Sequence, residues 1–171
     1  MSGLGLGLHD WPGFFKQVWD NLEPGGWLET GEVQFPSRRA DQEDQRPSPF
    51  IQWGENVLEG TRNAGIDAAA SEQFSDQLRA QGFIKVDRVD VQWPIKPWAK
   101  GDKNKYLGKL LYRNTLDAVL AITTGVFTKC LGWSKDQVDK CCKEVIEDVD
   151  DKESHFYYPM VLHLAQKPLD A

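Results

Sequence analysis

Two side chains in this sequence can transfer protons near neutral pH, and they are the candidates for catalysis. His155 stands just before Tyr157 to Gln166, a segment whose alternating pattern predicts a strand. A histidine there can give or take a proton; the alternative is a structural histidine bonded to a loop carbonyl. Glu32 lies near the carboxyl end of another predicted strand, Trp27 to Phe35, where α/β sheets bind ligands. The alternative for Glu32 is a solvated glutamate at a sheet edge.

The remaining histidines and acidic residues are weaker candidates. Glu29 falls on the opposite face of its predicted strand from Glu32, so these carboxylates cannot form an acid/base pair. His163 lies in the middle of the last predicted strand, where a packed or surface histidine is the more common case. His9 precedes a helix cap, a position that is usually exposed to solvent.

Several aromatic residues have the size and chemistry to line an apolar cavity for a hydrophobic small molecule of the polyketide or terpenoid kind. These candidate substrate-binding residues are Trp53, Trp93, Trp98, Tyr106 and Tyr112. The alternative is that each tryptophan simply packs in the core.

Composition excludes several classes of function. The formal net charge is −6, and basic residues form no cluster larger than a local triplet, which argues against nucleic acid and anionic membranes as partners. No apolar run approaches the roughly 20 residues of a membrane span. The three cysteines lack Cys-x-x-Cys spacing and indicate reduced thiols in a cytoplasmic protein. No metal-ligand cluster, nucleotide loop or Ser-His-Asp order is present, so we expect neither metal nor cofactor.

Alternating helices and strands would position the candidate residues. We expect one domain, 1–171, with a flexible leader over 1–9 and a mobile loop, usable as a lid, over 36–49. Periodicity and capping residues predict helices from Asp10 to Leu22, Phe50 to Ala64, Ser71 to Gln81, Tyr106 to Leu131 and Ser134 to about Asp148. Strands are predicted over Trp27 to Phe35, Phe83 to Trp93 and Tyr157 to Gln166.

Short segments in a fixed order resemble the fungal LaeA-like methyltransferases, which are class I (Rossmann-like) enzymes dependent on S-adenosylmethionine. The matching segments are His9-Asp10-Trp11, Leu22 to Glu29 with its Pro-Gly-Gly turn, Leu78 to Phe83, Trp93 to Trp98, Leu131 to Ser134 and His155 to Tyr157. These segments are distributed over nearly the whole chain. The sequence departs from the family at Lys96, where a glycine is usual.

This resemblance implies an α/β fold corresponding to the C-terminal half of a class I methyltransferase. About three strands would remain, with the last one antiparallel between the other two. The glycine-rich loop that holds S-adenosylmethionine would lie upstream of Asp10, and the series Gly3, Gly5, Gly7 lacks the required spacing. The first strand would keep an unpaired edge, which a homodimer would cover.

We therefore expect a methyltransferase-like protein of fungal secondary metabolism that has lost S-adenosylmethionine binding. It would catalyse a cofactor-independent cyclisation, isomerisation or elimination in an aromatic-lined pocket. One alternative is a methyltransferase, or a subunit of one, that needs a partner to supply the cofactor half. Another is a non-catalytic interaction protein.

Overall fold

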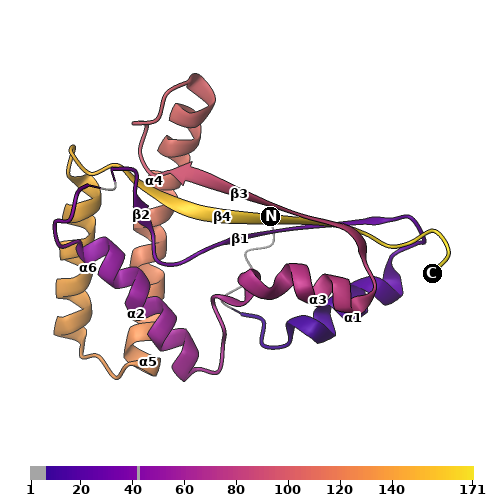
Figure 1. The fold of residues 1–171 in the computed structure, drawn as a ribbon. Coiled ribbons are helices and arrows are strands. Elements are labelled where there is room, and N and C mark those ends of the chain that lie inside the picture. The colour runs from indigo at the N-terminus through magenta and orange to yellow at the C-terminus, as the bar shows by residue number, and fades with distance from the viewer. Residues whose placement is uncertain (1–6, 42) are drawn as a thin grey trace. The chain divides into compact units, whose positions relative to one another are not determined.

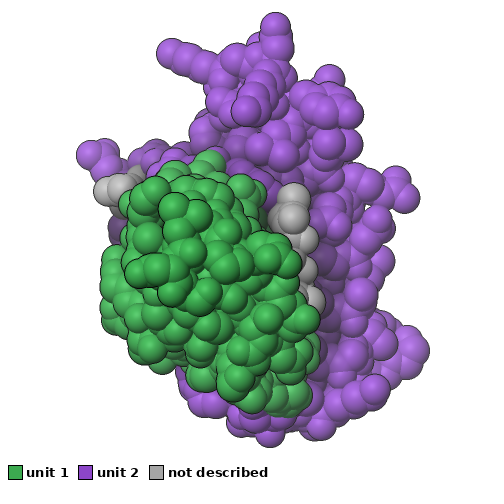
Figure 2. Space-filling model, turned by 90° about the vertical axis from the view of Figure 1, so that its right-hand side faces the viewer, with its two compact units in different colours: residues 1–34, 66–91, 160–171 green, residues 35–65, 92–159 purple. Residues whose placement is uncertain are grey.

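The computed structural model of the chain describes residues 7–41 and 43–171 and divides it into two compact units. Unit 1 comprises Met1–Gln34, Ile66–Val91 and Met160–Ala171, and unit 2 comprises Phe35–Gly65 and Gln92–Pro159 (Figure 2). Most of the predicted leader lies outside the described residues.

Strand β4 is the element to which the other described strands pair. It spans Phe156–Gln166 and is antiparallel to β1 (Trp27–Val33) and to the short β2 (Arg38–Arg39). The long strand β3 (Ile84–Pro94) also pairs with β4 (Figure 1). The predicted α/β class is thereby confirmed, as is the pairing of the last strand with both of the other predicted strands, which correspond to β1 and β3.

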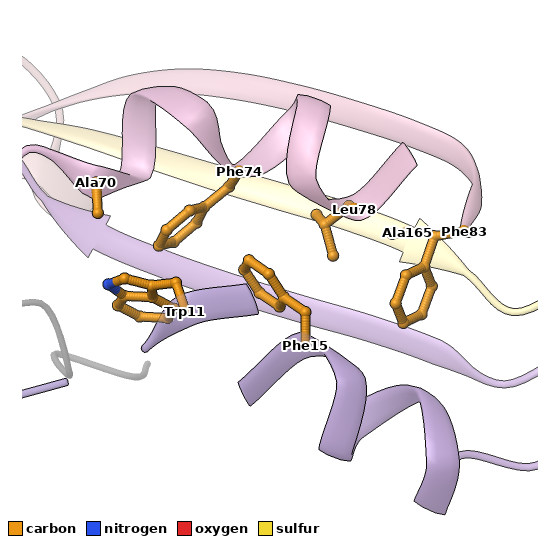
Figure 3. Close-up of a cluster of buried hydrophobic side chains, with 7 residues drawn as sticks. All are labelled: Trp11, Phe15, Ala70, Phe74, Leu78, Phe83 and Ala165. Atoms are coloured by element: carbon orange, nitrogen blue, oxygen red, sulfur yellow. The ribbon is translucent and has the colours of Figure 1, made fainter. Parts of the chain in front are cut away.

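In unit 1, helices pack against one face of the β1–β4 pair. They are α1 (Trp11–Asn21), the 3-10 turn η1 (Ala70–Gln73) and α3 (Phe74–Gln81). Their apolar side chains form a buried core cluster together with Phe83, which precedes β3, and Ala165 of β4. The cluster, shown in Figure 3, contains Trp11, Phe15, Ala70, Phe74, Leu78, Phe83 and Ala165. Leu28 of β1 packs against this cluster, whereas the ring of Trp27 is 50% exposed. The even-numbered face of β1 is therefore the face that meets the helices of unit 1.

Local capping chemistry explains where α1 and α3 begin and end. Asp10 caps α1 by accepting a 2.8 Å hydrogen bond from the Gly13 backbone, and Pro12 is tolerated in the first turn. Gly82 ends α3 with a φ of 107°, which glycine adopts without strain. The prediction that Ser71 caps this helix is wrong. Ser71 lies inside η1, because the chain enters α3 through a 3-10 turn.

Unit 2 is mainly helical. Its helices are α2 (Pro49–Asn63), α4 (Asp102–Ile122), α5 (Thr128–Cys130) and α6 (Lys135–Asp150), and the π-helical turn η2 (Thr123–Phe127) joins α4 to α5. Helices α2 and α6 pack against each other. The predicted helices over Phe50 to Ala64 and Tyr106 to Leu131 are confirmed within a few residues. So is the capping box of α6, in which Ser134 and Gln137 exchange hydrogen bonds.

The segment 36–49 carries more internal structure than its composition indicated. It contains β2, and the guanidinium of Arg46 binds the Asp44 carboxylate at 2.8 Å. The hydrogen bond from Arg46 holds the pKa of Asp44 well below its usual range. Arg39 donates to the backbone carbonyl of Asp44 at 3.3 Å. The role of this segment as a mobile lid stays a prediction.

Candidate functional site

A small cavity lies at the carboxyl end of β1, inside unit 1 and beside the core cluster. The residues that line it are Trp11, Glu32, Val33, Asp67, Ala68, Ala70, Ser71 and Phe74. The space left for the centres of water-sized groups is about 10 Å³, which is enough for one such group. Two of the lining residues are carboxylates and none is a lysine or an arginine. The cavity is therefore small and mostly apolar, and the charged residues that line it are acidic.

Glu32 is the sequence-predicted residue that the structure brings to this cavity. Glu32 is the second-to-last residue of β1, on the same face as Leu28, and only 4% of it is exposed. Glu29 lies three residues earlier on the opposite face and is exposed. The predicted separation of the two carboxylates is therefore what the structure shows, and Glu32 is the buried one.

Two buried hydrogen-bond donors line the same cavity. Trp11 is 3% exposed and Ser71 is 4% exposed, yet the indole Nε1 and the hydroxyl Oγ have no hydrogen-bond partner within residues 7–41 and 43–171. Figure 3 shows the Trp11 nitrogen on the side of the ring that faces Ala70, another lining residue. Buried donors in folded proteins are nearly always satisfied. Both donors are therefore available to a hydrogen-bond acceptor placed in the cavity.

A second pair of buried polar side chains extends from the cavity along the same face. Thr30 of β1 lies directly opposite His163 of β4, and both are buried. In the described part of the chain, neither the Thr30 hydroxyl nor either ring nitrogen of His163 has a hydrogen-bond partner. The His163 ring packs 5.5 Å from the ring of Phe74. Burial, with a contribution from the positive charge of Arg88, lowers the pKa of His163 and so favours a neutral imidazole.

A network of charged side chains on unit 1 influences the pKa of His163. Arg88 binds Glu72 at 2.7 Å and Asp90 at 2.8 Å, and Gln34 donates to Glu72. The hydrogen bond from Arg88 lowers the pKa of Glu72, so this carboxylate stays ionised over the physiological range. All four side chains are at least partly exposed, and the network acts on His163 through space.

In unit 2, the structure brings together two of the predicted residues. The rings of His155 and Trp98 lie 5.3 Å apart, and the Trp98 indole donates a 3.0 Å hydrogen bond to the backbone carbonyl of Phe156. His155 is exposed to solvent. The two ring planes are tilted by 35°. The catalytic role of His155 stays a prediction.

The other predicted aromatic residues occupy varied settings in unit 2. Trp53 is buried and donates to the Thr123 hydroxyl at 2.8 Å, and Trp93 is half-buried near the end of β3. Tyr112 donates to Asp150 at 2.6 Å, whereas Tyr106 is largely exposed. Their substrate-binding role stays a prediction.

The described residues contain no group of three or more His, Cys, Asp or Glu side chains placed to hold a metal ion. The cysteines Cys130, Cys141 and Cys142 are free thiols. None of the helices formed by residues 7–41 and 43–171 has the length and apolar character that a membrane crossing requires.

Comparison with known proteins identifies homologues that align with nearly the whole chain. It is 30% identical over 159 residues to a probable methyltransferase, tdiE, of Emericella nidulans, an alignment that covers 93% of this chain and 50% of the relative. It is 26% identical to methyltransferase pytC of Aspergillus terreus, covering 94% and 50%. It is 24% identical to the secondary metabolism regulator laeA of Aspergillus flavus, covering 92% and 43%. The chain thus spans about half the length of the curated relatives it matches.

A solved structure of phosphoethanolamine N-methyltransferase 2 from Haemonchus contortus aligns with 96% of this chain and 32% of its own, at 15% identity and a TM-score of 0.44. No protein-family model matches the sequence. The α/β fold and the methyltransferase relatives define the chain as a methyltransferase-like protein. More narrowly, it is a homologue of the fungal LaeA-like, tdiE and pytC methyltransferases and corresponds to about half of such a protein.

Proposed function

We propose that this methyltransferase-like chain transfers protons on a hydrophobic carbonyl compound of secondary metabolism without S-adenosylmethionine, in the cavity at the carboxyl end of β1. The outcome would be an isomerisation, a cyclisation or an elimination. One observation supports this proposal above the others. The buried carboxylate of Glu32 shares a single cavity with two buried donors, Trp11 Nε1 and Ser71 Oγ.

This set of groups matches the needs of proton abstraction next to a carbonyl. The Glu32 carboxylate would take the proton from the carbon beside the carbonyl, and the C–H electron pair would move to the carbonyl oxygen. The indole N–H of Trp11 and the hydroxyl of Ser71 would donate to the oxygen as it gains charge, and such donors act more strongly in a buried site than in water. The protonated Glu32 would then return the proton to another carbon, giving an isomer. Alternatively, the enolate would close a ring or expel a leaving group.

The small size of the cavity fits this division of roles. Its 10 Å³ admits one water-sized group, so the carbonyl oxygen would enter the cavity. The carbon that loses its proton would lie at the mouth within reach of the Glu32 carboxylate, and the rest of the compound would stay outside. In the resting protein a water molecule would take the same place, bridging the donors and the carboxylate.

The test is genetic complementation with paired variants. A strain lacking the gene would receive the wild-type gene, Glu32→Gln or the matched control Glu29→Gln, which removes an exposed carboxylate from the same strand. We expect Glu29→Gln to restore the metabolite and Glu32→Gln to restore little or none, with both proteins equally abundant. Full restoration by Glu32→Gln would remove the carboxylate from the chemistry and refute the proposal.

One structural observation favours a second function, that of a methyltransferase half completed by a partner chain. Among the strands of the described residues, β1 pairs with β4 alone, which leaves its other edge open for a further strand. The relatives are about twice as long as this chain. A tagged chain would then co-purify in equal amounts with a second protein, and S-adenosylmethionine would bind to the pair and not to the chain alone.

A further inference from the structure

Unit 2 contains a second and larger cavity, which lies between helices α2 and α6 and has no part in the proposed proton transfer. Its volume is about 300 Å³, at the small end of the range of ligand sites. The buried side chains of Trp53 and Val145 are among its lining residues, together with the half-buried Trp133 and Cys141. The cavity therefore offers two indole rings and an aliphatic side chain to a ligand.

Both indoles are fixed by the same irregular turn. Thr123, the first residue of η2, accepts the 2.8 Å hydrogen bond from Trp53 Nε1. Phe127, the last residue of η2, packs edge-on against Trp133 with ring centroids 4.9 Å apart. Single π-helical turns inside α-helices occur frequently at functional sites. Because the rings are held before any ligand arrives, binding would cost little side-chain ordering.

The polar residues around the cavity define the charge of its ligand. The only lysine and the only acidic residue that line it, Lys140 and Glu144, lie 3.8 Å apart, so their formal charges cancel. Gln52 and Asn56 add two side-chain amides, which contact each other only at 3.4 Å. Such long, exposed amide contacts are readily exchanged for hydrogen bonds to a ligand. A neutral compound with a hydrogen-bonding group fits this rim better than an ion does.

We infer that the α2–α6 cavity binds a neutral, flat aromatic compound of one or two rings that carries a hydroxyl or carbonyl group. The rings would lie against Trp53 and Trp133, and the polar group would meet the amides of Gln52 and Asn56. This site lies entirely in unit 2. Its test is therefore separate from that of the Glu32 cavity in unit 1.

The experiment uses three probes that share one ring system. The full chain would be titrated calorimetrically with neutral 2-naphthol, anionic 2-naphthoate and cationic 2-naphthylmethylammonium. We expect saturable one-site binding of 2-naphthol and at least about tenfold weaker binding of both ions. Trp133→Ala should weaken 2-naphthol binding by about tenfold or more, since it removes one wall of the site. The matched control Trp27→Ala, which deletes an exposed indole in unit 1, should leave binding unchanged.

A second readout keeps the test decisive if Trp133→Ala does not fold. Cys141 lines the cavity, and burial raises the pKa of its thiol to about 11. Because Cys141 lines the cavity, bound 2-naphthol should slow its alkylation by iodoacetamide relative to that of Cys130, measured by mass spectrometry at pH 8, where 2-naphthol is neutral. The inference is overturned if 2-naphthol shows no saturable binding, if the three probes bind equally, or if Cys141 is alkylated at the same rate with and without the probe.

Discussion

Substituting valine for Thr30 should stabilise the protein, although Thr30 is buried and polar. Its hydroxyl has no hydrogen-bond partner in the described residues. Valine has nearly the same shape and an equal preference for strands, so the change removes the hydroxyl without opening a cavity. Leaving a buried hydroxyl unsatisfied costs about 1–3 kcal/mol. We therefore expect Thr30→Val to raise the free energy of unfolding by about 1–2 kcal/mol.

The same substitution at Thr123 should act in the opposite direction. The Thr123 hydroxyl accepts from Trp53 Nε1 at 2.8 Å, and both residues are buried. Thr123→Val would leave the indole N–H without an acceptor, so we expect it to lower the free energy of unfolding by about 1–3 kcal/mol. The pair tests one rule at two sites, because among the described residues the hydroxyl is unpartnered at Thr30 and hydrogen-bonded at Thr123, where it also donates to the Val119 carbonyl.

Urea unfolding followed by circular dichroism would measure both effects. We expect the midpoint to rise for Thr30→Val with an unchanged slope, and the thermal midpoint to rise by roughly 2–4 °C per kcal/mol. If Thr30→Val instead lowered the free energy of unfolding by about 1 kcal/mol or more, the Thr30 hydroxyl would be satisfied by an ordered water. That result would contradict the prediction. A gain would support the view that this polar face is kept at the expense of stability, as functional sites often are.

Three further predictions follow from the same geometry. Burial lowers the pKa of His163 below the 6.5 of the unfolded chain. As the pH falls below about 6.5, the unfolded state therefore takes up a proton before the folded state does. The free energy of unfolding should then decrease, by at most about 1.4 kcal/mol per pH unit. In urea titrations His163→Leu should flatten this dependence and the exposed His155→Gln should not; an unchanged profile in His163→Leu would contradict the assignment. Trp11→Phe keeps an aromatic ring, although a smaller one, and deletes the N–H. It should slow product formation by about 10²–10³-fold if the indole donates to a developing oxyanion, whereas undiminished activity would exclude that role. Since the second edge of β1 has no strand partner in the described chain, light scattering should report a homodimer of twice 19.4 kDa, and a stable monomer would show that this edge is tolerated in water.

The elements whose signals are local were predictable from the sequence. A capping box placed the start of α6, and the spacing of apolar residues placed α2, because the groups that stabilise these helices are neighbours in the chain. The long strands followed from alternation and from the glycines and prolines around them. Strand β2 escaped prediction because its two residues, Arg38 and Arg39, are charged and form a strand only by pairing with β4.

The candidate site was predictable only in part. Glu32 stood out because a carboxylate near the end of a strand is conspicuous. The other cavity residues Trp11 and Ser71 did not stand out. They come from helical segments far from Glu32 in the sequence, and their spacing does not indicate that the three residues line one cavity. The one available signal was the alternation of Thr30 and Glu32, two polar residues on a face that α1 and α3 cover. The sequence also predicted that Ser71 caps a helix, which would have given its hydroxyl a backbone donor. In the structure this hydroxyl has no hydrogen-bond partner among the described residues.

We propose that this chain performs proton chemistry and not methyl transfer. The most direct test is to compare the elemental compositions, by high-resolution mass spectrometry, of the compound that accumulates without the gene and the compound that the wild-type gene restores. An isomerisation or cyclisation leaves the composition unchanged, and an elimination removes only the leaving group with its proton. We predict one of these outcomes. A product that exceeds its precursor by one CH₂ unit, and that becomes labelled when methyl-labelled methionine is fed, would show methyl transfer and contradict the proposed proton chemistry.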